Sequence, residues 1–105
     1  MRPNLFLGEY SITLNRGEGN SFGFRVKHFG SGTFKVVDII PGSPADINGN
    51  IDFGDTLVSV NDEAITENTH INMITNSIKE SRNYIRLRLK STPYLTGKIL
   101  NFLSY

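Results

Sequence analysis

The stretch Ser21-Phe22-Gly23-Phe24, with the loop Arg16-Gly17-Glu18-Gly19-Asn20 before it, decides how the rest of the chain is interpreted. The segments on either side alternate polar with apolar residues, which is typical of half-buried strands. Glycine between two phenylalanines lets the backbone turn sharply and lets a ligand approach the amide N–H groups. Because successive amides in a turn attract anions, the stretch predicts a carboxylate site beside an apolar pocket. The alternative is a hairpin loop whose two phenylalanines belong to the core.

Length and composition favour one small folded domain. The chain has 105 residues, of which 38% are hydrophobic and 20% charged, which is enough apolar material for one core. The formal net charge of +1 argues against the basic surface that nucleic-acid binding needs. Cysteine is absent, which fits a cytosolic protein. No apolar run approaches the roughly 20 residues that cross a bilayer, so we expect no direct membrane insertion.

Alternation of polar and apolar residues predicts most of the strands. Strands are expected over residues 10–15, 24–29, 34–40, 56–60 and 84–90, with a brief one at Ala64-Ile65. Asn61 and Asp62 both tolerate positive φ, so they predict a tight turn after the fourth strand.

Two helices are predicted between the strands. Ser43 is a good helix cap and Pro44 suits the first helical position, so a short helix is expected over residues 44–48, closed by Gly49. Ile71, Ile74 and Ile78 fall at i, i+3 and i+7, which predicts a longer helix over residues 70–79. We therefore expect a mainly β fold, a small barrel or sandwich with two helices at its open ends.

The organisation along the chain is a leader, one domain and an extension. The leader spans residues 1–9, and its apolar core is too short for a secretory signal. The domain spans residues 10–90. In the extension, residues 91–105, Leu95, Ile99 and Leu103 fall at i, i+4 and i+8, which favours an amphipathic helix.

Catalytic and metal-binding chemistry has little support in the sequence. The chain has two histidines, His28 and His70, and a zinc site built on them would need carboxylate partners that no spacing indicates. The glycine-rich loop precedes a strand, whereas phosphate-binding loops precede a helix. We expect neither an enzyme, a metal site nor a cofactor.

A groove is expected where the second strand meets the longer helix. His70, Ile74 and Ile78, spaced by four, share one face of the predicted helix. If this face lies beside residues 24–29, the closed end of the groove holds the amides of residues 22–24. The unpaired edge of the second strand would then be a template on which an extended peptide adds a further strand.

At this point the chain resembles a known family. Ser21-Phe22-Gly23-Phe24 resembles the carboxylate-binding loop of PDZ domains, and other stretches agree in order and spacing: Pro41-Gly42-Ser43-Pro44-Ala45-Asp46, Gly54-Asp55-Thr56-Leu57-Val58-Ser59-Val60-Asn61 and Thr69-His70. The resemblance covers residues 10–90. Arg16-Gly17-Glu18 is similar to the same place in membrane-associated guanylate kinases with inverted domain order, or in a related junction scaffold.

The resemblance implies a six-stranded, partly open barrel or sandwich capped by a short and a longer α-helix. It also implies that C-terminal tails of other proteins bind between the second strand and the second helix. The amides of Phe22, Gly23 and Phe24 would hold the terminal carboxylate, with Arg16 as further support.

The side chains of the bound tail would then meet particular residues. The last side chain would enter a pocket lined by Phe22, Phe24, Val26 and Ile78, with Ile74 on the same helix. His70 would accept a hydrogen bond from a serine or threonine two residues before the end. Arg25 would favour acidic side chains further along the tail.

Three positions depart from the family pattern. Asp62 follows Asn61 where glycine is usual, and Ser21 occupies a place where glycine is common. The apolar pattern after His70 is one residue longer than the family spacing. If the extra residue precedes the helix, Ile71 takes the place of His70, and apolar-x-apolar tails become the alternative to Ser/Thr-x-apolar tails.

The main hypothesis is a non-catalytic binding module that recruits partner tails to a scaffold. Its partners would be C-terminal peptides of membrane receptors, channels, signalling or viral proteins, and its location cytoplasmic, under the plasma membrane or at cell junctions. The rival is a structural or self-assembling domain whose groove holds another chain's C-terminus. The chain itself ends in Leu103-Ser104-Tyr105, an apolar-x-apolar tail, so self-association is weighed beside a monomer.

Overall fold

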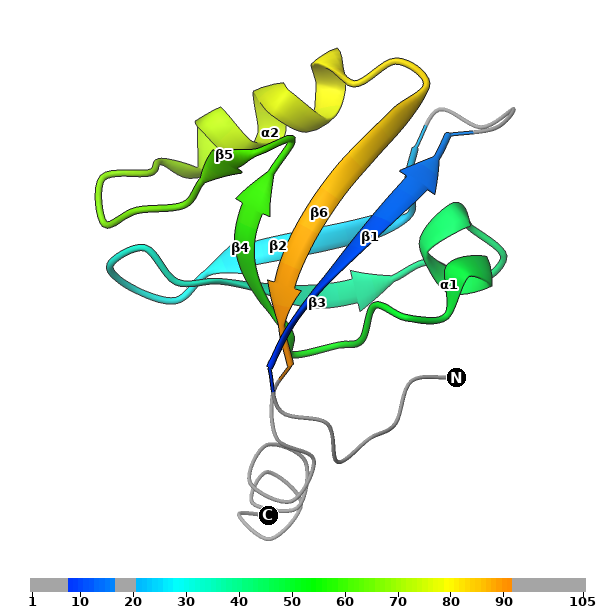
Figure 1. Cartoon of the computed structure of the whole chain (residues 1–105), viewed down its shortest axis with the longest axis horizontal. Helices are drawn as coiled ribbons and strands as arrows, with labels where there is room; N and C mark the ends of the chain where they lie inside the picture. The colour runs from blue at the N-terminus through cyan, green and yellow to red at the C-terminus, as the bar shows by residue number, and fades with distance from the viewer. Residues whose placement is uncertain (1–7, 17–20, 92–105) are drawn as a thin grey trace, which may run out of the picture.

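A computed structural model describes residues 8–16 and 21–91 of the chain. It contains six strands and two helices, which confirms the predicted mainly β fold (Figure 1). In chain order they are β1 (Glu9–Asn15), β2 (Phe24–His28), β3 (Phe34–Ile39), α1 (Pro44–Asn48), β4 (Thr56–Val60), β5 (Glu63–Ala64), α2 (Ile71–Glu80) and β6 (Tyr84–Lys90). Residues 1–7 of the leader and residues 92–105 of the extension lie outside the described part of the chain.

The strands form one open sheet in the order β1-β6-β4-β3-β2, and β5 pairs with β4 beside this path. All of the pairings are antiparallel. Because the sheet does not close, β1 and β2 are its two end strands in the described structure. The α1 helix lies beside β1, while α2 lies beside β4 and β5 (Figure 1).

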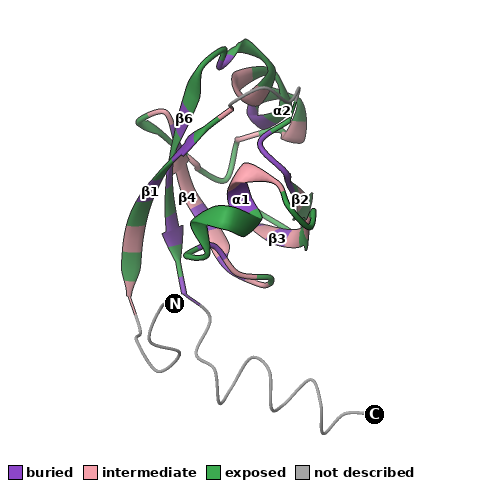
Figure 2. Ribbon diagram, turned by 90° about the vertical axis from the view of Figure 1, so that its right-hand side faces the viewer, coloured by how far each residue is buried: buried purple, intermediate pink, exposed green. Residues whose placement is uncertain are grey.

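The core lies inside the curved sheet. On β6 the residues Ile85, Leu87 and Leu89 are buried, while the arginines between them are exposed. Strands β1, β3 and β4 contribute their own inward residues, and Phe22 joins them from the loop before β2. Figure 2 shows these buried positions alternating with exposed ones along the strands. This period of two is the pattern expected of strands with one face on the core.

The boundaries of five elements, β1, β2, β3, β5 and α2, differ by one residue from those expected. Strand β2 ends at His28, and the N–H of Phe29 donates to Thr33 O at 2.8 Å at the start of the hairpin turn. The α2 helix begins at Ile71, with His70 as its extended cap. No helix in the described residues is long and apolar enough to cross a membrane.

The short helix forms as its sequence predicts. Ser43 caps α1 and its Oγ accepts from the N–H of Asp46 at 3.3 Å, while Pro44 begins the helix. Gly49 ends it in the left-handed conformation at φ +76°. The turn after β4 also has the expected backbone, because Asn61 and Asp62 both have positive φ.

The start of α1 supports the loop that leads into β2. The N–H of Ala45 donates to Phe22 O at 3.0 Å, and the N–H of Ile40 donates to Gly23 O at 2.8 Å. Gly23 has φ +89°, and a Cβ added there would lie 1.9 Å from the Oγ of Ser43. Glycine is therefore required by the backbone conformation and by the contact with α1.

Replacing Gly23 tests this contact, and Gly42 offers a matched control. Gly42 has a similar φ of +79°, but an added Cβ would meet nothing within 4 Å. Gly42→Ala should cost only the backbone strain of about 1–2 kcal/mol, and Gly23→Ala should cost clearly more, because the methyl group displaces Ser43. Chemical denaturation measures both. Equal losses of unfolding free energy in the two variants would show that the loop does not depend on the contact with α1.

Candidate functional site

A small cavity lies between the loop before β2 and the last turn of α2. Its volume is about 180 Å³. We call it the end pocket, and it is lined by Arg16, Ser21, Phe22, Phe24, Ile78 and Lys79. Phe22 and Phe24 are buried and Ile78 is half-buried, so part of the pocket is apolar. Arg16 and Lys79 bring two cations to it. The end pocket therefore suits an apolar side chain next to a negative charge.

The backbone of the loop turns its amides away from α1. The carbonyls of Phe22 and Gly23 both accept hydrogen bonds on the α1 side. In a trans peptide the C=O and the following N–H point in opposite directions, so the N–H groups of Gly23 and Phe24 point away from α1. The Gly23 N–H meets the Oγ of Ser21 at 2.9 Å. A carboxylate bound at the Gly23 amide would therefore replace the Ser21 hydroxyl as the acceptor of the Gly23 N–H.

One side of β2 carries backbone groups that do not bond to β3. The bond from Ile40 N–H to Gly23 O makes residues 23 and 40 a hydrogen-bonded pair, and the bond from Phe29 N–H to Thr33 O does the same for residues 29 and 33. A register shift between Arg25 and Val26 separates the two patterns. Since bonded and non-bonded pairs alternate, the backbone groups of residues 24, 26 and 28 point away from β3. They form a free edge beside the end pocket.

The three groove residues predicted on α2 lie in different environments in the structure. His70 lies just before the helix and is exposed, and its Nδ1 accepts from the N–H of Asn72 at 3.1 Å. Ile71 is the first helical residue and lies two turns before Ile78 on the same side of the helix. Ile74 is only 3% exposed and belongs to the core. The side of α2 that continues from the end pocket therefore carries Ile71, with Thr75 between it and Ile78.

Arg16 holds the end of α2 against the loop. Its Nη2 donates to Ser81 O at 2.6 Å and to Ile78 O at 3.2 Å. These carbonyls lie at the end of the helix, where Ile78 O also accepts from the N–H of Ser81 at 3.2 Å. The guanidinium carbon lies 4.7 Å from the centre of the Phe22 ring. The Nε is buried without a hydrogen-bond partner in the described structure. Arg16 therefore links β1, α2 and the floor of the end pocket.

The remaining predicted residues lie on β2. Arg25 is exposed and its Nε lies 3.9 Å from Asp38 on the neighbouring strand. Val26 is half-buried and packs against the core, but it is not among the described residues that line the end pocket. His28 stacks on Phe34 of the neighbouring strand with 4.5 Å between ring centres. No group of acidic, histidine or cysteine side chains in the described residues could hold a metal ion.

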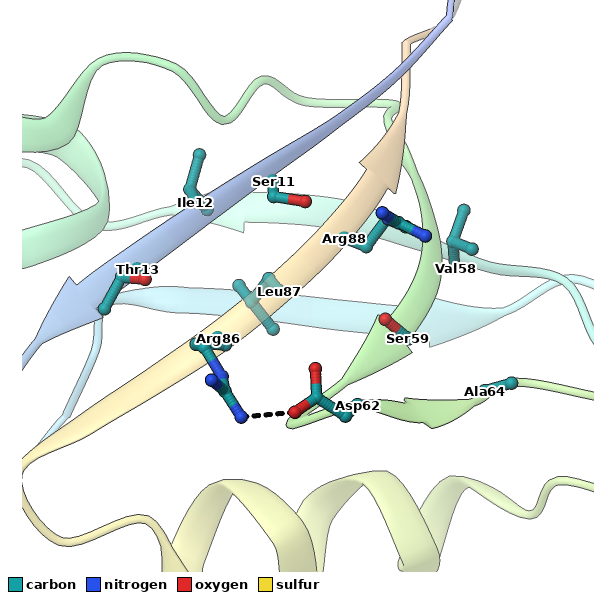
Figure 3. A pocket seen from close by; sticks show the side chains of 10 residues that line it. All are labelled: Ser11, Ile12, Thr13, Val58, Ser59, Asp62, Ala64, Arg86, Leu87 and Arg88. Carbon is teal, nitrogen blue, oxygen red and sulfur yellow. Dashed lines mark hydrogen bonds and ion pairs between the residues drawn. The ribbon is translucent and has the colours of Figure 1, made fainter.

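A larger hollow, of about 380 Å³, lies elsewhere, on the outer face of β1, β6 and β4 (Figure 3). We call it the outer hollow. Its two arginines are neutralised, because Arg86 pairs with Asp62 and Arg88 lies 3.8 Å from Glu9. It is polar and lies away from the free edge of β2, so it lacks both features that a peptide-binding groove needs.

Two residues of the end pocket were not singled out from the sequence. Lys79 follows Ile78 directly and brings a cation that the apolar pattern of the helix does not reveal. Ser21 was treated only as the first position of the loop, and the structure shows its hydroxyl on the Gly23 amide. A hydroxyl two residues before a glycine turn is a recognisable signal for such a bond.

Comparison with known proteins agrees with this geometry. The family model of the PDZ domain matches residues 11–90. The structure is similar to the second PDZ domain of Dlg1 from the choanoflagellate Monosiga brevicollis, with a TM-score of 0.71 and 26% sequence identity. The match covers 81% of this chain and 100% of the choanoflagellate domain. PDZ domains are protein-interaction modules that bind C-terminal peptides. The chain therefore belongs to the PDZ domain family.

Proposed function

We propose that this chain binds the free C-terminus of a partner protein in the groove between β2 and α2. The observation that carries the proposal is the free edge of β2 leading into the end pocket. An extended tail would pair with the backbone of residues 24, 26 and 28 as an added strand. Its carboxylate would reach the amides of Gly23 and Phe24, and its last side chain would enter the end pocket. Lys79 and Arg16 would favour the negative charge there.

Amidated peptides provide the direct test. A tail with a free carboxylate should bind at least about tenfold more tightly than the same tail with an amidated end, since charge-assisted hydrogen bonds contribute roughly 1.5–3 kcal/mol each. Calorimetric titration of paired peptides measures the ratio. Equal affinities for both ends would exclude carboxylate capture and would favour the rival, a domain whose loop only closes a hairpin.

We further propose that the groove prefers apolar-x-apolar tails over Ser/Thr-x-apolar tails. The Nδ1 of His70 accepts the Asn72 N–H, so the neutral ring carries its proton on Nε2. That nitrogen donates a hydrogen bond and does not accept one from a hydroxyl group. Ile71 begins the helix on the side of Ile78 and offers an apolar contact instead.

Two substitutions separate these preferences. Ile71→Ala should weaken a Val-x-Val tail by about tenfold, because it removes apolar contact area, and should affect a Thr-x-Val tail less. His70→Asn keeps a helix cap and should leave the ratio of the two affinities unchanged. Peptide titrations of both variants measure the ratios. A selective loss for the threonine tail in His70→Asn would instead assign the preference to the histidine.

The wider role remains a proposal as well. We propose that the domain is part of a cytoplasmic scaffold that gathers proteins carrying such tails. A groove of this kind reads only the last few residues of a tail, so receptors, channels, signalling and viral proteins all qualify if they end in an apolar-x-apolar pattern. Pull-down with immobilised tails of these classes, with and without their last residue, measures which class is retained.

A further inference from the structure

The sheet has a second free edge, on β1. In the described structure β1 pairs with β6 alone. The bonds from Arg16 N–H to Asn83 O and from Ser91 N–H to Gly8 O show that even-numbered residues of β1 bond to β6. The backbone of Arg86, which lies opposite Thr13, agrees with this alternation. Its N–H donates to Asn61 Oδ1 and its C=O accepts from the Asn61 N–H, so neither group faces Thr13. The backbone groups of residues 9, 11, 13 and 15 therefore point away from the sheet.

The strand itself lacks the features by which edge strands usually block strand addition. Such features are a proline, a lysine or a bulge within the strand. The seven residues of β1 contain neither proline nor a basic residue, and their register with β6 has no shift. Ser11 and Thr13 are exposed. Figure 2 shows β1 at the margin of the described structure. The α1 helix is in contact with β1 (Figure 1) and, within the described residues, leaves its backbone ladder unpaired on the outer side.

We propose that a second copy of the chain pairs with this edge, β1 against β1, in an antiparallel and symmetric dimer. A twofold axis at Ile12, the middle of the strand, aligns the whole of both strands. Ser11 then faces Thr13 of the second copy, and Glu9 faces Asn15 of the second copy. All of these residues have outward backbone groups, so the pairing can form about eight hydrogen bonds, two for each of four residue pairs.

The side chains of β1 suit a copy of themselves. Hydroxyl groups of serine and threonine form favourable cross-strand pairs. The only charge on the strand is Glu9, which lies near Arg88 and would face a neutral asparagine. The twofold arrangement therefore brings no like charges together. Ser11 and Thr13 also line the outer hollow, which would continue across the axis from one copy to the other (Figure 3).

The dimer leaves the peptide grooves free. Strand β2 is at the opposite end of the sheet from β1, so the two β2 edges would lie at the outer ends of the joined sheet. If the proposed function holds, one dimer presents two grooves and gains avidity for clustered tails. The pairing itself does not depend on that function.

Sedimentation of the full chain from micromolar to millimolar concentration tests the proposal. The mass should rise from one chain towards two. Thr13→Pro removes an outward N–H without disturbing the ladder to β6, and should raise the dimer dissociation constant roughly thirtyfold, because each dimer loses two hydrogen bonds. Thr13→Val keeps the N–H group and should dimerise nearly as the parent does.

Two further measurements keep the outcome decisive. Saturating the groove with a peptide should leave the dimer intact, whereas loss of the dimer would indicate a tail-in-groove contact and overturn the proposal. If Thr13→Pro fails to fold, the double variant Ser11→Lys/Thr13→Lys places like charges opposite each other and should be a monomer. A single-chain mass for the parent at every concentration, or a dimer that survives both edge variants, would also overturn the proposal.

Discussion

The structure depends on the contact between the glycine turn and the start of α1. The amides of Ile40 and Ala45 bind two successive carbonyls of the turn, and the absent side chain of Gly23 leaves room for Ser43. These contacts fix the peptide planes, so the amides that follow must face the opposite side. The same contacts place Phe22 in the core and start β2 in register with β3. The binding loop is therefore held by the hydrophobic core and by α1, and a bound carboxylate is not needed to shape it.

An open sheet gives this small domain its capacity for interaction. A closed barrel would satisfy every backbone group, but here the two end strands keep a row of donors and acceptors that have no strand partner among residues 8–16 and 21–91. The β2 edge lies next to an apolar pocket and two cations, which fit the free C-terminus that we propose it binds. The β1 edge is bordered by the hydroxyl groups of Ser11 and Thr13, which suit the second copy that we propose pairs there. The chemistry beside each edge thus favours a different kind of partner.

Local signals explain how much could be predicted from the sequence. The alternation of Ile85, Leu87 and Leu89 with arginines identified β6, and Ser43, Pro44 and Gly49 identified both ends of α1. The sequence also predicts that Ile78 faces the glycine loop, and in the structure Ile78 lines the end pocket together with Phe22 and Phe24. These features depend on neighbours in the chain, which the sequence displays directly.

Features that the apolar pattern does not display could not be predicted in this way. His70 caps α2 through the bond from the Asn72 N–H, and a helix that began at His70 would have the same apolar pattern. The stripe of three isoleucines does not reveal that Ile74 turns to the core while Ile71 continues the side of Ile78. The bonds from Arg16 to the end of α2 span more than sixty residues. Contacts between elements that are far apart in the sequence decide the last two features.

Amide hydrogen exchange of the domain with a bound C-terminal peptide tests the central claim most directly. An added strand on β2 would protect the N–H groups of Phe24, Val26 and His28, because these point away from β3. The N–H groups of Arg25 and Lys27 already face β3, so the peptide should change their exchange little. Protection at these alternate positions is the result that strand addition predicts. Unchanged exchange at Phe24, Val26 and His28 in a saturated complex would contradict it, because the peptide would then bind elsewhere.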